Sequence, residues 1–131
     1  MFKLDEKYRL SDNCRTEAKV DETFMEIQIN GNDFVLIRSQ QSDGAQGSPL
    51  VKRFSLGRNC FWTRTSGKQL KSLFEFKPNS LVSSHCQLIE TISDRGKITK
   101  YFYHFNLLTN SLTIEWTIGS IKKVEVFNKI N

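Results

Sequence analysis

Short segments that alternate apolar and polar residues run along most of this chain, and their period of two limits the fold more than any other feature. The first segment places Met25, Ile27 and Ile29 on one face and polar residues on the other, as in a half-buried strand. An Asn-Gly-Asn sequence at 30–32 then favours a tight hairpin turn. Further segments of strand character are 34–38, 51–56, 59–63, 70–76, 82–92, 98–107, 111–118 and 121–127.

Many short strands separated by turns are typical of an antiparallel sandwich or barrel, and we expect an all-β, single-domain antiparallel β-sandwich. The 131 residues, 38% of them hydrophobic, suffice for one core. Residues 1–21 mix five acids and five bases without a clear period, which predicts an N-terminal arm or one short helix. The β-sandwich domain is expected over 22–131.

Positive charge is concentrated in one part of the chain. The net charge is +5, and residues 51–74 contain six basic residues and no acidic one. Such a stretch on a surface favours phosphate, acidic peptide, anionic lipid headgroups or nucleic acid. The alternative is a solvated loop whose lysines only maintain solubility.

Several function classes lack the residues that they need. The three cysteines have no C-x-x-C spacing and His85 and His104 sit at no ligand spacing, so we expect free thiols, no metal site and no cofactor. No catalytic motif is present. Ser83 and Ser84 lie beside His85, but neighbouring residues on a strand point to opposite faces, so we expect no nucleophile-base pair and a protein that is not an enzyme. No apolar stretch approaches the roughly 20 residues that cross a bilayer, and we expect an intracellular protein, cytoplasmic or nuclear.

Three segments together resemble the forkhead-associated (FHA) domain pattern. They are Phe-Ser-Leu-Gly-Arg at 54–58, an apolar strand followed by Leu-Val-Ser-Ser-His within 73–88, and Phe-Asn-Leu-Leu-Thr-Asn-Ser at 105–111. The family pattern has a strand ending in Leu-Gly-Arg, a Ser-x-x-His loop and a Thr-Asn-Gly turn. The resemblance implies a β-sandwich that binds phosphothreonine peptides through loops at one end, without catalysis.

The resemblance also implies roles for individual residues. Gly57 would shape the turn, and Arg58 would reach the phosphate or the peptide backbone. His85 would brace its loop from inside, and Asn110 would hold the main chain of the peptide.

The phosphate-binding serine of the family falls on Val82 in this chain. Ser83 or Ser84 would therefore have to bind the phosphate from a shifted loop. Arg64 and Lys68, in the acid-free stretch, would add positive charge to the same face.

The leading hypothesis is a non-catalytic interaction module that binds a phosphorylated or acidic peptide of a partner protein. One alternative is an anionic-lipid module of the pleckstrin-homology type, suggested by the basic loop and the late Trp116. Another is a nucleic-acid binder that stacks bases on the aromatic residues of 101–105. A last one is an assembly subunit that pairs through an exposed strand edge at 121–127.

Overall fold

The structure is a computed structural model, and it describes residues 6–10, 22–42, 45–46, 49–64, 66–76, 85–106 and 108–130. Within these ranges every regular element is a strand, which confirms the all-β prediction. The strands are β1 (Glu6–Leu10), β2 (Glu22–Asn30), β3 (Asp33–Ser42), β4 (Ala45–Gln46), β5 (Leu50–Ser55), β6 (Asn59–Thr63), β7 (Gln69–Phe76), β8 (His85–Asp94), β9 (Lys97–Asn106), β10 (Ser111–Ile118) and β11 (Ile121–Lys129).

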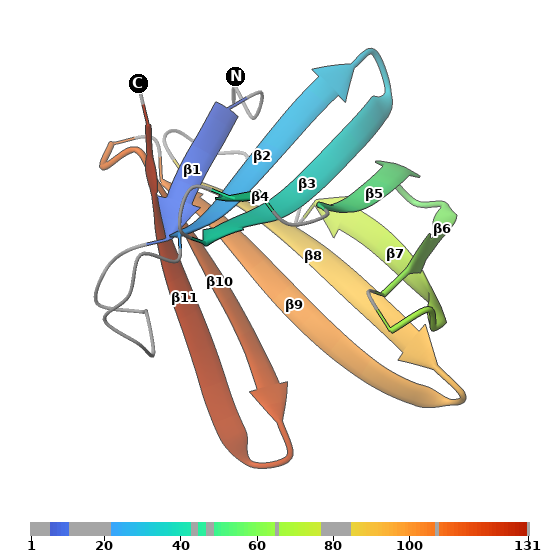
Figure 1. The fold of residues 1–131 in the computed structure, drawn as a ribbon. Coiled ribbons are helices and arrows are strands. Elements are labelled where there is room, and N and C mark those ends of the chain that lie inside the picture. Colours follow the sequence, from blue (N-terminus) through green and yellow to red (C-terminus); the bar gives the residue numbers. More distant parts are fainter. Residues whose placement is uncertain are drawn as a thin grey trace.

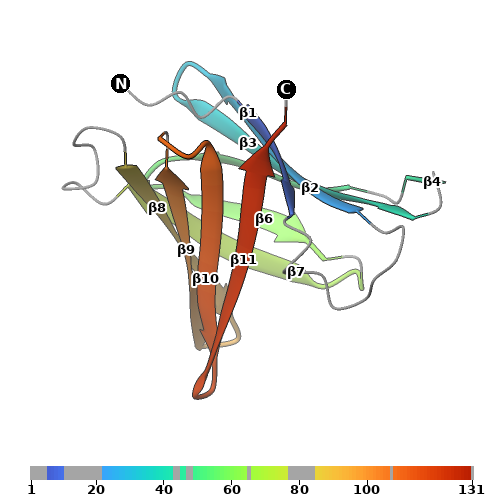
Figure 2. The same ribbon diagram turned by 90° about the vertical axis from the view of Figure 1, so that its left-hand side faces the viewer.

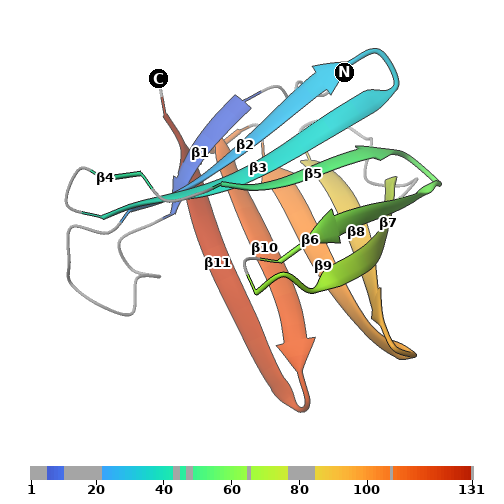
Figure 3. The ribbon, with the colours of Figure 1, turned by 45° about the vertical axis from the view of Figure 1, so that its right-hand side comes forward.

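The strands form one antiparallel sheet that curls into a nearly closed barrel (Figure 1). Its order is β4-β3-β2-β1-β11-β10-β9-β8-β7-β6, and β5 pairs with the other edge of β3. Strands β5 and β6 lie side by side (Figure 3), yet no ladder joins them among the described residues. The remaining gap in the barrel therefore lies between β5 and β6.

The predicted β-sandwich is wrong, because the two halves of the protein are hydrogen-bonded to each other. In a sandwich two separate sheets pack face to face. Here β1 pairs with both β2 and β11, with Tyr8 opposite Lys129 and Leu10 opposite Phe127. Figure 2 shows β8–β11 standing across the layer of β1–β3, to which they are joined through β1. Strand β1 lies in the stretch 1–21 where an arm or helix was expected; residues 1–5 and 11–21 lie outside the described residues.

Alternation along the strands places one set of side chains inside the barrel. The interior is rich in aromatic rings, and Phe54 stacks between Phe34 and Phe74 with centroid distances of 5.2 and 3.7 Å. Three polar residues, Lys52, Ser72 and Glu90, are as buried as this core. The buried apolar residues are Tyr8, Leu10, Met25, Ile27, Phe34, Leu36, Phe54, Cys60, Trp62, Leu70, Phe74, Leu88, Ile92, Tyr103, Phe105, Leu112, Ile114 and Phe127.

The terminal strand is less of an edge than the sequence suggested. β11 pairs with β10 from Ile121 to Asn128, and with β1 over Phe127–Lys129. Of the expected edge at 121–127, only Phe127 is covered by β1, and the ladder with β1 does not reach 121–126.

No helix within the described ranges is long and apolar enough to span a membrane.

Two leucines close together in the sequence test the position of the core. Leu112 on β10 has 0% of its surface exposed, whereas Leu108 in the preceding turn is 75% exposed. We expect Leu112→Ala to lower the free energy of unfolding by about 2–5 kcal/mol, because it removes buried methyl groups and leaves a cavity. The matched control Leu108→Ala should change it by less than about 0.5 kcal/mol. Equal effects in urea denaturation would contradict this packing.

Candidate ligand-binding cavity

A cavity of about 340 Å³ lies inside the barrel and opens to solvent. Strands from both sides of the β5–β6 gap contribute to its wall, and most of the wall is aliphatic or aromatic. Its lining residues are Met25, Leu36, Arg38, Leu50, Lys52, Trp62, Arg64, Ile92, Tyr101, Tyr103, Ile114, Trp116 and Glu125.

The lining residues that remain partly accessible mark the opening of this cavity. Tyr101 on β9 and Trp116 on β10 are ladder partners, and their rings stack with a centroid distance of 5.2 Å. Both rings are half-buried, as are Leu50 at the start of β5 and the ion pair Arg38–Glu125, while Arg64 after β6 is exposed. Two rings, one aliphatic side chain and charged groups of both signs therefore surround the entrance.

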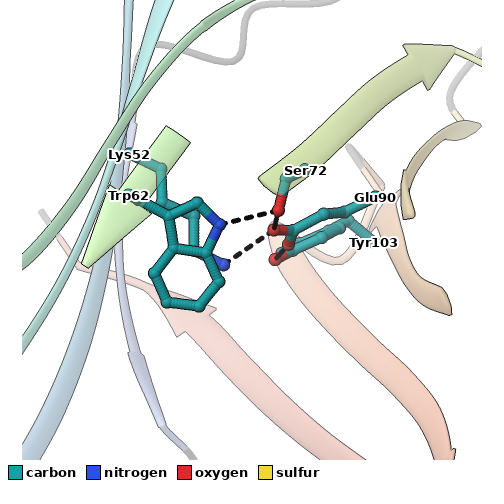
Figure 4. A network of polar contacts seen from close by, with 5 residues as sticks. All are labelled: Lys52, Trp62, Ser72, Glu90 and Tyr103. Carbon is teal, nitrogen blue, oxygen red and sulfur yellow. Dashed lines mark hydrogen bonds and ion pairs between the residues drawn. The ribbon is translucent and has the colours of Figure 1, made fainter. Parts of the chain in front are cut away.

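The first polar centre of the interior is the carboxylate of Glu90, which has 0% of its surface exposed (Figure 4). Its Oε2 accepts hydrogen bonds from Lys52 Nζ at 2.8 Å and Ser72 Oγ at 2.7 Å, and its Oε1 accepts one from Tyr103 OH at 2.6 Å. Burying an isolated ionised carboxylate costs much free energy, and these three donors offset that desolvation cost.

Lys52 is held from two sides. Besides its ion pair with Glu90, its ammonium lies over the indole ring of Trp62, 3.9 Å from the ring centroid. The Trp62 Nε1–H in turn donates to Ser72 Oγ at 2.7 Å, which closes the network in Figure 4. The cation is thus compensated by a carboxylate and an aromatic face.

Burial and the charge of Glu90 change the acidity of two neighbours. Burial, the nearby carboxylate and the hydrogen bond to it raise the pKa of the Tyr103 phenol well above its ordinary value. Burial, with a smaller contribution from Glu90, also raises the pKa of the Cys60 thiol. Both groups therefore stay protonated at neutral pH, and Cys60 has little thiolate character.

The second polar centre is an ion pair between β3 and β11. Arg38 Nη1 and Nη2 donate to the two oxygens of Glu125 at 2.9 and 2.8 Å, a bidentate geometry. Burial lowers the pKa of the Arg38 guanidinium, but the hydrogen bonds and charge of Glu125 outweigh this effect and leave the pKa raised. The guanidinium also lies 5.8 Å from the centroid of the Phe127 ring.

The residues proposed from the sequence lie at both ends of β6. Gly57 has φ +75° in the β5–β6 turn, and its N–H donates to the carbonyl of Phe74 at 2.9 Å. Arg58 follows in this turn and is exposed. Arg64 lies beyond the other end of the strand, where its N–H donates to the carbonyl of Lys68 at 2.8 Å.

The structure brings together only part of that proposed set. Arg64 and Lys68 share the β6–β7 turn, and Lys68 Nζ pairs with Asp94 at 2.6 Å. That contact, with desolvation opposing it, lowers the pKa of the Asp94 carboxyl. Arg58 does not join them, since β6 separates it from Arg64.

Three further proposed residues lie elsewhere. Asn110 adopts φ 52° in the β9–β10 turn, where its carbonyl accepts the N–H of Lys129. Ser83 and Ser84 lie outside the described residues, and so does the side chain of His85, whose backbone begins β8.

The sequence analysis missed the four charged residues of the interior. Each occupies an inward position of an alternating strand: Arg38 follows Phe34 and Leu36, and Glu90 lies between Leu88 and Ile92. A charge on the apolar face of a strand is a readable signal, because such a charge must find a partner when it is buried. Lys52 and Glu125 stand in equivalent positions on β5 and β11.

Solved structures with a similar fold include fatty acid-binding proteins. One from Schistosoma mansoni, in complex with arachidonic acid, matches with a TM-score of 0.72 at 12% identity over 98% of this chain and 96% of that one. One from brain tissue of Drosophila melanogaster matches with a TM-score of 0.65 at 19% identity, covering 95% and 98% of the two chains. Fatty-acid-binding protein 1 of Echinococcus granulosus matches with a TM-score of 0.71 at 10% identity over 96% of each chain.

These identities establish a shared fold and nothing further. No protein-family model matches the chain, and no curated protein matches its sequence. The FHA resemblance is wrong, because the fold is a barrel like that of the fatty acid-binding proteins. The phosphopeptide-binding function that this resemblance implied is therefore wrong as well.

Removing one charge of the buried pair should be more harmful than removing both. Glu90→Leu leaves the Lys52 ammonium buried without a counter-charge, and we expect it to lower the free energy of unfolding by about 3–5 kcal/mol. The double variant Lys52→Met/Glu90→Leu should recover part of this loss, although Ser72 and Tyr103 still lose their acceptor. Urea denaturation measures both changes. A double variant less stable than Glu90→Leu would contradict the pairing.

The environment of Tyr103 predicts a dependence on alkaline pH. Its pKa is raised in the folded state, so the stability gained by burying the neutral phenol is complete below the ordinary pKa of about 10 and is lost as the pH rises above it. Absorbance titration of the phenolate should show that Tyr103→Phe removes a tyrosine that ionises above its ordinary pKa. Loss of a tyrosine that titrates near its ordinary pKa would contradict this environment.

Proposed function

We propose that this protein binds one hydrophobic, lipid-like molecule inside the barrel. The observation that carries the proposal is the cavity itself, whose volume of about 340 Å³ lies in the range of small-molecule sites, roughly 300–1,000 Å³. Aliphatic and aromatic walls with a few placed polar groups suit a ligand with a long apolar body.

Similar folds support the same class of ligand. The three similar proteins named above bind fatty acids, and one of them was solved with arachidonic acid. The lipid-binding alternative predicted from the sequence therefore agrees better with these similar folds than the phosphopeptide hypothesis does. It placed the lipid headgroup on a basic surface loop, whereas the cavity would take the apolar body of the ligand into the interior.

The proposal is one of binding without catalysis. The buried titratable groups are engaged with one another: Glu90 accepts three hydrogen bonds, and Glu125 accepts two from Arg38. A carboxylate committed in this way is a poor general base, since a base must be free to take a proton from its substrate. The intracellular location stays a prediction.

Binding of a neutral fluorescent dye tests the site. We expect Nile red to bind the delipidated protein at one site with enhanced emission. Leu50→Trp, at the cavity entrance, should weaken binding about tenfold because the larger ring fills the opening. Val51→Trp is the matched control, since alternation along β5 directs it away from the cavity. Equal binding by both variants, or no binding by the folded native chain, would refute the proposed site.

A further inference from the structure

Resting on the proposed function, we infer that the ligand carries an uncharged polar head group, as in a long-chain alcohol, ester or amide, and that the cavity disfavours a free carboxylate. The inference depends on the charges that line the cavity and on the partners that they already have.

The cations inside the cavity are neutralised by the protein itself. Lys52 pairs with Glu90 and Arg38 pairs with Glu125, both with an N–O distance of 2.8 Å. The two cations and two carboxylates leave no net charge among these four groups. A ligand that enters this space therefore meets ion pairs, and no unpaired interior cation among the described residues.

The hydrogen-bond donors and acceptors that these ion pairs leave unused suit a neutral head group. An ammonium has three N–H donors, and Lys52 gives one to Glu90 while its Nζ lies over the face of the Trp62 ring. Each oxygen of Glu125 accepts one hydrogen bond from Arg38, although a carboxylate oxygen has a second lone pair. An alcohol can donate to Glu125 or accept from Lys52, and an ester or amide carbonyl can accept from Lys52.

A carboxylate would disturb this balance. It would add a third negative charge to two cations that each already have a carboxylate partner. At Arg38 it would have to share the guanidinium, two of whose five N–H donors already bind Glu125. Beside the buried pair of Lys52 and Glu90, a further carboxylate would have no counter-charge of its own, which is unfavourable.

Arg64 is the remaining cation of the cavity lining, and its guanidinium has no ion pair among the described residues. It stands at the entrance and is exposed to water. An ion pair in water is weak and screened by salt. Arg64 therefore adds little preference for an anionic ligand over a neutral one.

Competition with bound Nile red by three ligands of equal chain length tests the inference on the unmodified chain. The ligands are palmityl alcohol, methyl palmitate and palmitate, near neutral pH and below the concentration at which palmitate aggregates. We expect the alcohol and the ester to bind at least about tenfold more tightly than palmitate. Palmitate binding as tightly as the alcohol would overturn the inference and leave the proposed function intact.

A single substitution should reverse the selectivity. Glu125→Gln keeps the shape of the side chain but frees the charge of Arg38, so palmitate should bind about tenfold more tightly while the alcohol changes by less than about twofold. Glu115→Gln is the matched control, since Glu115 lies on the outer face of β10, 3.0 Å from Lys122. It should change neither affinity.

The double variant Arg38→Gln/Glu125→Gln removes both charges and should show no gain for palmitate. A gain in this variant, or no gain in folded Glu125→Gln, would overturn the role of the ion pair. If the folded native chain binds none of the three ligands and no Nile red, the proposed function fails, and the inference fails with it.

Discussion

The buried carboxylate of Glu90 is the constraint around which the interior is arranged. A carboxylate with no exposed surface needs donors on all sides, and they come from β5, β7 and β9: Lys52, Ser72 and Tyr103. The contact with Lys52 matters most for the fold, because β5 and β6 share no ladder among the described residues. The ion pair between Lys52 on β5 and Glu90 on β8 therefore links the two sides of the barrel across the gap between β5 and β6, where the part of the chain that the structure describes forms no backbone ladder.

The pair Arg38–Glu125 performs a similar task between β3 and β11, which are not neighbours in the sheet. Both pairs cross the interior, and both set the electrostatics of the cavity. Because each cation already has its own carboxylate, the interior combines polar hydrogen-bonding groups with a balance of charge. The fold that this chain shares with fatty acid-binding proteins does not determine which head group a ligand can have. The residues that line the cavity determine that specificity.

The strand content could be read from the chain because alternation is local. Met25 and Ile27 mark β2, and Leu88 and Ile92 mark β8, without any knowledge of their neighbours in space. The same local reading failed for the FHA resemblance. A glycine such as Gly57, with φ +75°, is needed in tight turns of many β-folds, so Leu-Gly-Arg carries little information about topology. The strand β1 was missed because three of its five residues are charged, which hid the alternation of Tyr8 and Leu10 within a charged stretch.

The sequence by itself determined that this chain forms short antiparallel strands with one apolar face, since that property depends on residues next to one another. The alternation also places four charged residues at inward positions, a signal that our sequence analysis did not use. Only the tertiary structure decided that the sheet closes through β1 and β11 and that Lys52 meets Glu90 and Arg38 meets Glu125. These partners are 38 and 87 positions apart in the chain, and no local pattern specifies which distant charge a buried charge will find.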